Sequence, residues 1–301
     1  MNIVIFGAGA IGSLFGALLY KKNNVVLIGI SSHVNAIKKN GLKITGKTNM
    51  SVNISSEDSV DNVTFSVDLL ILTVKSHDTK SAINQAKKII DDNTVILSLQ
   101  NGLDNIDNIK KIIDSNQIIA GVTTYGAIFS EPGIIKHTGI GQTILGELNT
   151  QESERLNNIV KVFNEVGIET AISMDIIKEI WIKTIVNSSI NPLTTLFQCK
   201  NGYLLKNPIL EKIVEKVCKE SVNIANAAGT NLSYQDMVQK TKEVIRNTSD
   251  NYSSMLQSTK KNKKTEIDSI NGRLAEIGRM HNIDCSLNEI LVYLIKSRSR
   301  Y

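Results

Sequence analysis

The sequence predicts a two-domain chain in which an α/β domain with a parallel sheet, residues 1–173, is followed by an all-helical domain, residues 174–301. Three observations predict this division. Short β-branched apolar runs alternate with amphipathic stretches in the first part, and stretches with a 3.6-residue period replace them in the second. The length of 301 residues also suits two domains of roughly 100–200 residues each.

The first predicted element is a strand over residues 3–6, which passes directly into Gly7-Ala8-Gly9-Ala10-Ile11-Gly12 and then into an apolar helix. This G-x-G-x-x-G spacing, in the order strand, turn and helix, is typical of Rossmann-type dinucleotide-binding domains. Gly7 allows the tight turn, Gly9 allows a pyrophosphate to approach the backbone, and Gly12 allows close helix packing. The helix N-terminus favours negative phosphate. We therefore expect a dinucleotide across this turn, with a chance glycine cluster as the alternative.

The remaining elements of the first domain follow the same alternation of strands and helices. Strands are predicted over residues 24–30, 68–74, 94–99 and 118–123, and helices over 79–90 and 105–113. Residues 134–147 contain glycine at 139, 141 and 146 between alternating apolar positions, which predicts antiparallel strands that close the edge of the sheet. A helix over 151–166 and a short strand over 168–172 complete the domain.

The second half contains only helical patterns. Helices are predicted over residues 176–189, 209–228, 234–246 and 252–281. Parallel sheets bind ligands at the carboxyl ends of their strands, so we expect the helical domain to form the other wall of a cleft there.

Composition excludes several classes of protein. Hydrophobic residues at 42%, charged residues at 21% and three prolines are typical of a soluble globular protein, and a net charge of +5 does not indicate nucleic-acid binding. The lysine-rich run 260–264 is interpreted as a solvated helix face, with attraction of an anionic cofactor as the alternative. Three separated cysteines indicate reduced thiols in the cytoplasm rather than disulfides or zinc. Neither a signal peptide nor a membrane span is predicted.

Polar residues follow two predicted strands at the edge where the cleft would open. Lys75 follows the strand that ends at Val74, and Asn101-Gly102 follows the strand 94–99. Taken singly, such residues are ordinary loop residues. On successive strands of a dinucleotide-binding sheet, they are better explained as contacts to cofactor and substrate.

A sharper pattern is Lys183, Asn187 and Asn191, which recur every four residues and so share one face of a helix. On a generic helix such a face is solvated. The intervening positions are strongly apolar, however, which predicts a mostly buried helix. A polar stripe on a buried helix needs partners, and a polar ligand can supply them.

Ser254 and Glu266 form the last candidate pair. On the expected continuous helix, twelve residues separate them by ~18 Å, so they would contact different parts of a long ligand. The alternatives are a helix cap at Ser254 or Asn251 and a surface carboxylate at Glu266.

Together these motifs resemble the ketopantoate reductase (2-dehydropantoate 2-reductase) family over essentially the whole chain. The matching segments are Gly7 to Gly12, Val74-Lys75-Ser76, Gln100-Asn101-Gly102, Pro132-Gly133 with His137, Gly139 and Gly141, Trp181 to Thr194, Asn201-Gly202, Ser253-Ser254-Met255 and Thr265 to Asp268. The ordered set is specific, although each motif alone is not. The family combines a Rossmann domain with a helical domain.

The resemblance implies NADPH-dependent reduction of 2-dehydropantoate to (R)-pantoate, a step toward pantothenate and coenzyme A. It implies Lys183 as the proton donor, because an ammonium group can stabilise and then protonate the oxygen of the ketone. It implies substrate contacts from Asn101, Lys183, Asn187, Asn191, Asn201 and Ser254. It implies cofactor contacts from the glycine turn, Lys75, Asn101, Ala127 and Glu266, the last of which also organises the catalytic site. Ser31, after the second strand, is a further expected cofactor contact.

One departure concerns the cofactor. Family members commonly carry an arginine after the second strand that pairs with the 2′-phosphate of NADPH, whereas this chain has Gly29-Ile30-Ser31-Ser32-His33. The acidic residue typical of NAD sites is also missing from that strand end. Ser31, Ser32 or His33 could donate to a phosphate, and Lys38 or Lys39 could reach it. NADP is therefore expected ahead of NAD.

Two other functions stay open at this point. The substrate could be another small branched 2-keto acid, since pocket shape discriminates by only ~1–3 kcal/mol per methylene. The chain could also be a dinucleotide-binding sensor without turnover, which would leave Lys183 and Glu266 unexplained. The expected partner is a small molecule, with no metal, nucleic acid or membrane, and a homodimer is compatible with the helical domain.

Overall fold

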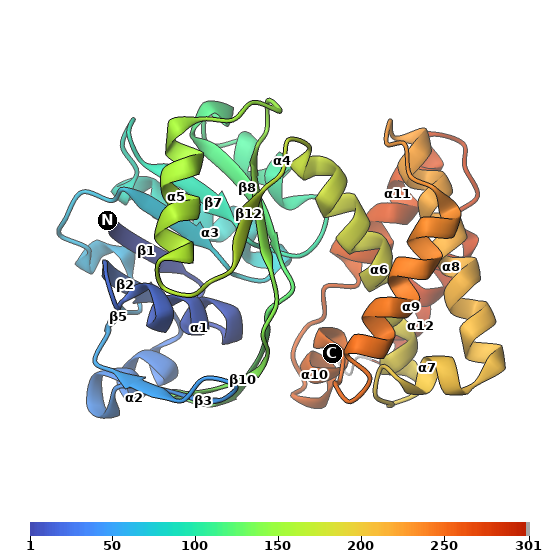
Figure 1. Ribbon diagram of the computed structural model, residues 1–301, viewed down its shortest axis with the longest axis horizontal. Coiled ribbons are helices and arrows are strands. Elements are labelled where there is room, and N and C mark those ends of the chain that lie inside the picture. The colour runs from blue at the N-terminus through green and yellow to red at the C-terminus, as the bar shows by residue number, and fades with distance from the viewer. Residues whose placement is uncertain (299–301) are drawn as a thin grey trace. The chain divides into compact units, whose positions relative to one another are not determined.

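The computed structural model describes residues 1–298 of the chain. Its contacts divide the protein into two compact units, which Figure 1 shows in blue to green and in yellow to red. The sheet unit comprises residues 1–100 and 105–179, and the helical unit comprises residues 101–104 and, of the described residues, 180–298. The segment 101–104 thus packs with the helical unit although it follows a strand of the sheet, a placement that the periodicity of the sequence did not indicate.

The sheet unit is built on an eight-stranded sheet with the order β12-β11-β8-β7-β6-β1-β2-β5. These strands are β1 (Asn2–Phe6), β2 (Asn24–Ile28), β5 (Ser55–Glu57), β6 (Leu69–Leu72), β7 (Val95–Ser98), β8 (Ile118–Thr123), β11 (Thr143–Glu147) and β12 (Thr170–Ile172). β1 pairs in parallel with β2 on one side and with β6 on the other. The chain therefore reverses its direction of travel across the sheet at β1, which is where doubly wound sheets bind ligands.

A second sheet of four strands, with the order β4-β3-β10-β9, was only partly predicted. It contains β3 (Leu42–Gly46), β4 (Met50–Val52), β9 (Gly126–Glu131) and β10 (Ile134–Gly139). The expectation that residues 134–147 form antiparallel strands is confirmed for β11, which pairs antiparallel with β8. The expectation that they close the edge of the main sheet is wrong, because β12 pairs with the other side of β11 and is the edge strand. β10 instead pairs with β3 and β9, because Ile135 joins the same buried cluster as Leu42 and Ile44.

The helices of the sheet unit confirm the predicted alternation. They are α1 (Ala10–Leu19), α2 (Ser31–Asn40), α3 (Thr79–Ala86), α4 (Asn105–Lys110) and α5 (Glu154–Asn164). α1 and α5 meet in the core, where the ring of Phe15 makes edge contacts with those of Tyr125 and Phe163. This aromatic contact holds α1, and with it the glycine turn, against the sheet.

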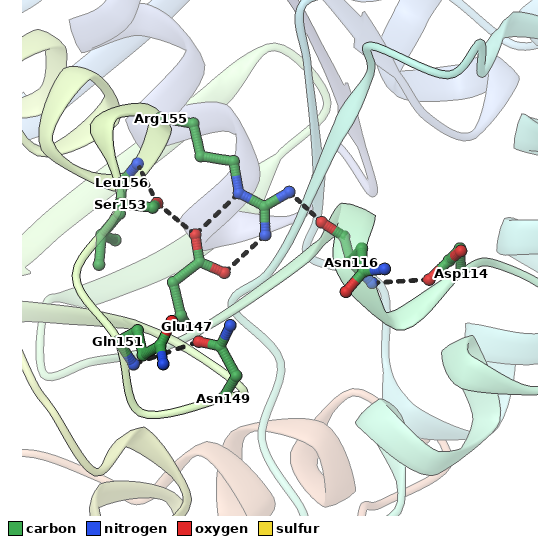
Figure 2. Close-up of polar contacts among 8 residues, drawn as sticks. All are labelled: Asp114, Asn116, Glu147, Asn149, Gln151, Ser153, Arg155 and Leu156. Atoms are coloured by element: carbon green, nitrogen blue, oxygen red, sulfur yellow. Dashed lines mark hydrogen bonds and ion pairs between the residues drawn. The ribbon is translucent and has the colours of Figure 1, made fainter.

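A buried carboxylate connects β11 to α5, as Figure 2 shows. Glu147 accepts hydrogen bonds from Arg155 Nε at 2.7 Å and from Ser153 Oγ at 2.5 Å, while Ser153 also caps α5 by accepting from the amide of Leu156. Arg155 donates in addition to the carbonyl of Asn116. A buried charge is stable only when it is paired in this way, so the cluster is a structural tie.

The helical unit contains eight helical segments among the described residues. They are α6 (Ile176–Leu196), α7 (Tyr203–Lys206), α8 (Pro208–Ala227), α9 (Tyr234–Asn247), α10 (Ser254–Lys260), the π-helical turn η5 (Asp268–Gly272), α11 (Arg273–Met280) and α12 (Ser286–Arg298). The predicted helices at 176–189, 209–228 and 234–246 are confirmed. No helix within residues 1–298 has the length and apolarity that crossing a membrane requires.

The predicted single helix over residues 252–281 is wrong. α10 ends at Lys260, a non-helical segment follows, and η5 and α11 form separately. Asn262 has φ +51, a left-handed conformation that ends a helix. The run 260–264 is exposed as expected, but after Lys260 it lies in this connection and not on a helix face.

Candidate functional site

The turn between β1 and α1 requires glycine at two positions and is open at the third. Gly7 has φ +113, and a Cβ there would lie 2.5 Å from the amide nitrogen of Val74. A Cβ on Gly12 would lie 2.3 Å from the carbonyl oxygen of Gly7. A Cβ on Gly9, in contrast, would meet no atom nearer than 3.8 Å. The backbone at Gly9 therefore has space beside it for a ligand.

The amides around this turn divide into two groups. Those of Gly7 and Ala8 both donate to the carbonyl of Ile28, so these residues shape the turn. α1 begins at Ala10, and the first amides of an α-helix have no acceptor within the helix. The amides of Ala10, Ile11 and Gly12 thus lie at the positive end of α1 beside the open face of Gly9. These groups fit the pyrophosphate of a dinucleotide.

The other cofactor candidates of the sheet unit surround this turn. Ser31 is the first residue of α2 and follows β2, and Lys75 follows β6, so they lie beyond the two strands that flank β1. Ala127 lies in β9, which packs against α1. The fold therefore brings Ser31, Lys75 and Ala127 to elements adjacent to the glycine turn.

In the helical unit, α6 carries the predicted polar face. Lys183 and Asn187 are half-buried and Asn191 is 5% exposed, while Ile185 and Val186 between them belong to the core of the unit. The burial of Asn191 excludes the interpretation that the whole polar face of α6 is solvated. The side chains of this face thus have limited access to water, as a polar binding surface requires.

Asn201 and Ser254 are brought to the end of α6 by two hydrogen bonds. Thr194 Oγ1 donates to Ser253 Oγ at 2.7 Å, and the amide of Asn201 donates to the carbonyl of Asn251 at 3.0 Å. Ser253, and not Ser254 or Asn251, caps α10 by accepting from the amide of Leu256, which leaves Ser254 exposed in the first turn.

The amide side chain of Asn201 is directly informative about a ligand. Asn201 is 7% exposed, and its Nδ2 donates to Thr248 Oγ1 at 2.9 Å. Its Oδ1 is buried and has no hydrogen-bond partner. A buried acceptor without a donor is unfavourable, and a hydroxyl group of a substrate would satisfy it.

Glu266 and Asn101 also belong to this unit and are held close to η5. The amide of Leu103 donates to the carbonyl of Ser269, so the segment of Asn101 packs on η5, and the amide of Ile270 donates to the carbonyl of Glu266. Glu266 is buried, which rules out a surface carboxylate. Its neighbour Ile267 shares an apolar cluster with Met255, the neighbour of Ser254. The separation of ~18 Å expected for one continuous helix does not apply.

Two supporting residues were missed by the sequence reasoning. Thr73 Oγ1 donates to the carbonyl of Gly7 at 2.8 Å and so holds the glycine turn from β6. Asn271 Nδ2 donates to the carbonyl of Ser188 at 3.1 Å. Pro192 was the sequence signal for such a residue. A proline inside a helix has no N–H, so the carbonyl four residues earlier, that of Ser188, needs a donor from elsewhere.

His33 does not provide positive charge near the glycine turn at neutral pH. His33 is fully buried, and burial lowers its pKa to about 4. Its Nδ1 accepts from the amide of Gly133 at 2.9 Å and its Nε2 contacts Ser13 Oγ at 3.0 Å. The suggestion that His33 donates to a cofactor phosphate is therefore wrong, because both of its nitrogens are used inside the core. Within residues 1–298 no group of His, Cys, Asp or Glu is arranged to hold a metal ion.

The glycine turn at the reversal point of a parallel sheet defines a dinucleotide-binding protein of the Rossmann class. The sequence then identifies which one. The chain belongs to the ketopantoate reductase family, because residues 3–150 match the family model "Ketopantoate reductase PanE/ApbA" and residues 175–299 match its C-terminal model. The family binds a nicotinamide dinucleotide.

Individual relatives agree with this assignment. The chain is 40% identical over 301 residues to the 2-dehydropantoate 2-reductase of Pyrococcus horikoshii, covering 99% of this chain and 97% of that protein. The crystal structure of a ketopantoate reductase of the same family from Ralstonia eutropha superposes with a TM-score of 0.91 at 27% identity, covering 99% and 98% of the two chains. A ternary structure of D-mandelate dehydrogenase with NADH and anilino(oxo)acetate superposes with a TM-score of 0.93, also at 27% identity and the same coverage.

Proposed function

We propose that this protein reduces 2-dehydropantoate to (R)-pantoate with a nicotinamide dinucleotide, a step toward pantothenate and coenzyme A. Residues 1–173 would hold the dinucleotide and residues 174–301 the substrate. Besides family membership, the observation that carries the proposal is the polar surface of the helical unit. There Lys183, Asn191 and the unpartnered Oδ1 of Asn201 lie on segments joined by hydrogen bonds.

When bound, the dinucleotide supplies the hydride and the protein supplies orientation and a proton. The positive end of α1 would hold the pyrophosphate, and Lys75 and Ala127 would contact the nucleotide from neighbouring elements. Lys183 donates a proton from Nζ to the ketone oxygen, where negative charge develops during reduction.

The remaining polar residues orient the substrate. Asn187, Asn191 and Ser254 bind its carboxylate and hydroxyl groups, and Asn201 accepts a hydrogen bond from a hydroxyl. Asn101 and Glu266, both next to η5, contact the cofactor, and Glu266 also organises the catalytic site. A cytoplasmic location and a homodimer are parts of the same proposal.

The test is a steady-state assay of the full-length protein with 2-dehydropantoate and a panel of small 2-keto acids, in which loss of the reduced nicotinamide absorbance is followed. We expect 2-dehydropantoate to have the highest kcat/KM of the panel. If another branched 2-keto acid has a higher kcat/KM, that compound is the preferred substrate, and the proposed reduction of a 2-keto acid still holds. Dinucleotide binding without turnover of any member would overturn the proposed reaction.

A further inference from the structure

The end of β2 lies beside a carboxylate that the local sequence does not reveal. β5 pairs in parallel with β2 so that Ile28 lies opposite Glu57, and the amide of Gly29 donates to the carbonyl of Glu57 at 3.0 Å. Asp58, the next residue, therefore lies at the level of the residues that follow β2. Ile28 also accepts from the amides of the glycine turn, so Asp58 is on the ligand-binding edge of the sheet.

The side chains at this position form a defined contact. Ser31 Oγ donates to Asp58 Oδ2 at 2.9 Å, which places the carboxylate at the start of α2. Asp58 is exposed, and the neighbouring Ile30 is 61% exposed, which leaves an apolar surface next to the carboxylate. An acidic residue at the end of the second strand is the group that binds the adenosine ribose hydroxyls in Rossmann domains. Here the residue that follows β5, the strand next to β2 in the sheet, supplies the carboxylate in space.

The lysines of α2, together with Arg155 and His33, do not favour a phosphate here. Lys38 Nζ pairs with Glu57 Oε2 at 2.8 Å, so a carboxylate already offsets its charge. Lys39 lies eight residues after Ser31, about 12 Å along the helix. The single arginine among residues 1–179 is Arg155, which is paired with the buried Glu147 (Figure 2). His33 is buried and bonded through both nitrogens.

We propose that Asp58 accepts hydrogen bonds from the adenosine ribose hydroxyls and repels a 2′-phosphate, so that the protein binds NADH more tightly than NADPH. This inference rests on the dinucleotide binding of the proposed function and reverses the preference for NADP that the family resemblance implies. A 2′-phosphate placed beside Asp58 would bring two negative groups together, and the nearby Lys38 is already paired with Glu57. The free hydroxyls of NADH would instead be donors to the carboxylate.

The experiment measures the affinities of NADH and NADPH for the full-length protein by calorimetric titration without a keto acid. In the unmodified protein we expect NADH to bind about tenfold more tightly or better. Asp58→Asn should reduce the ratio of the two affinities severalfold, by weakening NADH and relieving repulsion of NADPH. The matched control is Asp61→Asn, which removes the same charge from an exposed aspartate that pairs with Lys88. It should leave the ratio unchanged.

Each outcome bears on a separate claim. NADPH binding as tightly as NADH, or an Asp58→Asn variant with an unchanged ratio, would overturn the role of Asp58. The same ratio change in Asp61→Asn would also overturn it, because the effect would then be one of net charge. NADH binding with the expected ratio but without reduction of 2-dehydropantoate would overturn the proposed reaction alone. Failure of both dinucleotides to bind would overturn both.

Discussion

The glycine turn of the sheet unit and the polar face of α6 offer a ligand opposite kinds of group. The turn offers backbone amides, the space beside Gly9 is open, and packing requires glycine at positions 7 and 12. α6 offers side chains, and its backbone is occupied by helical hydrogen bonds except where Pro192 interrupts them. Changes at the turn should therefore act on folding and on dinucleotide affinity, whereas changes on α6 should act on catalysis.

The largest expected effect is on the side-chain surface. Lys183→Ala should lower kcat by about 10²–10⁴-fold, the usual contribution of a general acid, with dinucleotide affinity nearly unchanged. Steady-state kinetics and a binding titration measure the two quantities. Lys178→Ala, five residues earlier on α6, is the matched control and should keep normal kcat. Equal activity of the two variants would place the proton donor elsewhere.

The second prediction separates two glycines of one turn. Gly12→Ala should lower the free energy of unfolding by about 1–3 kcal/mol or more, since its Cβ would meet the Gly7 carbonyl at 2.3 Å. Gly9→Ala has room for its Cβ, so stability should hold while dinucleotide affinity falls. Hydrogen exchange of the β1 amides reports stability, and calorimetry reports affinity. A stable Gly12→Ala protein would contradict the close packing of α1 on the turn.

The third prediction concerns the interrupted backbone of α6. Asn271→Leu should lower the free energy of unfolding by about 1–3 kcal/mol, because the carbonyl of Ser188 loses its donor. The loss should be smaller in a Pro192→Ala background, where residue 192 supplies an N–H to that carbonyl. Trp181 is the only tryptophan and is buried in this unit, so its fluorescence during urea unfolding reports the transition. An equal loss in both backgrounds would exclude this explanation.

The smallest expected effect is the pH dependence of the sheet unit. His33 has a pKa of about 4 when folded and about 6.5 when unfolded, so below pH 6.5 the unfolded chain binds the additional proton. Above pH 6.5 His33 is neutral in both states and the folded protein keeps its full stability. As the pH falls from 6.5 toward 4, protonation of the unfolded chain progressively lowers the free energy of unfolding. Between pH 8 and pH 5 we expect a loss of about 1–2 kcal/mol in the free energy of unfolding. His33→Gln should remove this part of the pH dependence, and an unaltered profile would show that other groups cause it.

Much of the site was predictable because its signals are local. Around Gly7 and Gly12 the apolar pattern changes from that of a strand to that of a helix within a few residues. The four-residue spacing of Lys183, Asn187 and Asn191 identifies one helix face. Asn191 on this face is buried, which agrees with the interpretation of a mostly buried helix.

Contacts between distant segments were less predictable. The second sheet pairs β3 with β10, whose residues are about 90 positions apart, and no local pattern specifies such a partner. The helix expected over 252–281 has continuous periodicity, yet packing breaks it at Lys260 and places a π-helical turn next to Glu266. Strand pairing and helix breaks of this kind depend on which apolar faces share a core.

The sequence alone determined the fold class, the glycine turn and the polar face of α6, because hydrophobic period and glycine spacing act within a few residues. Only the tertiary structure brought Asp58 to Ser31 across the β2–β5 pair and Asn271 to Ser188 across the helical unit. Such contacts join residues that are separated along the chain. Their formation depends on the packing of whole elements, which a local pattern does not encode.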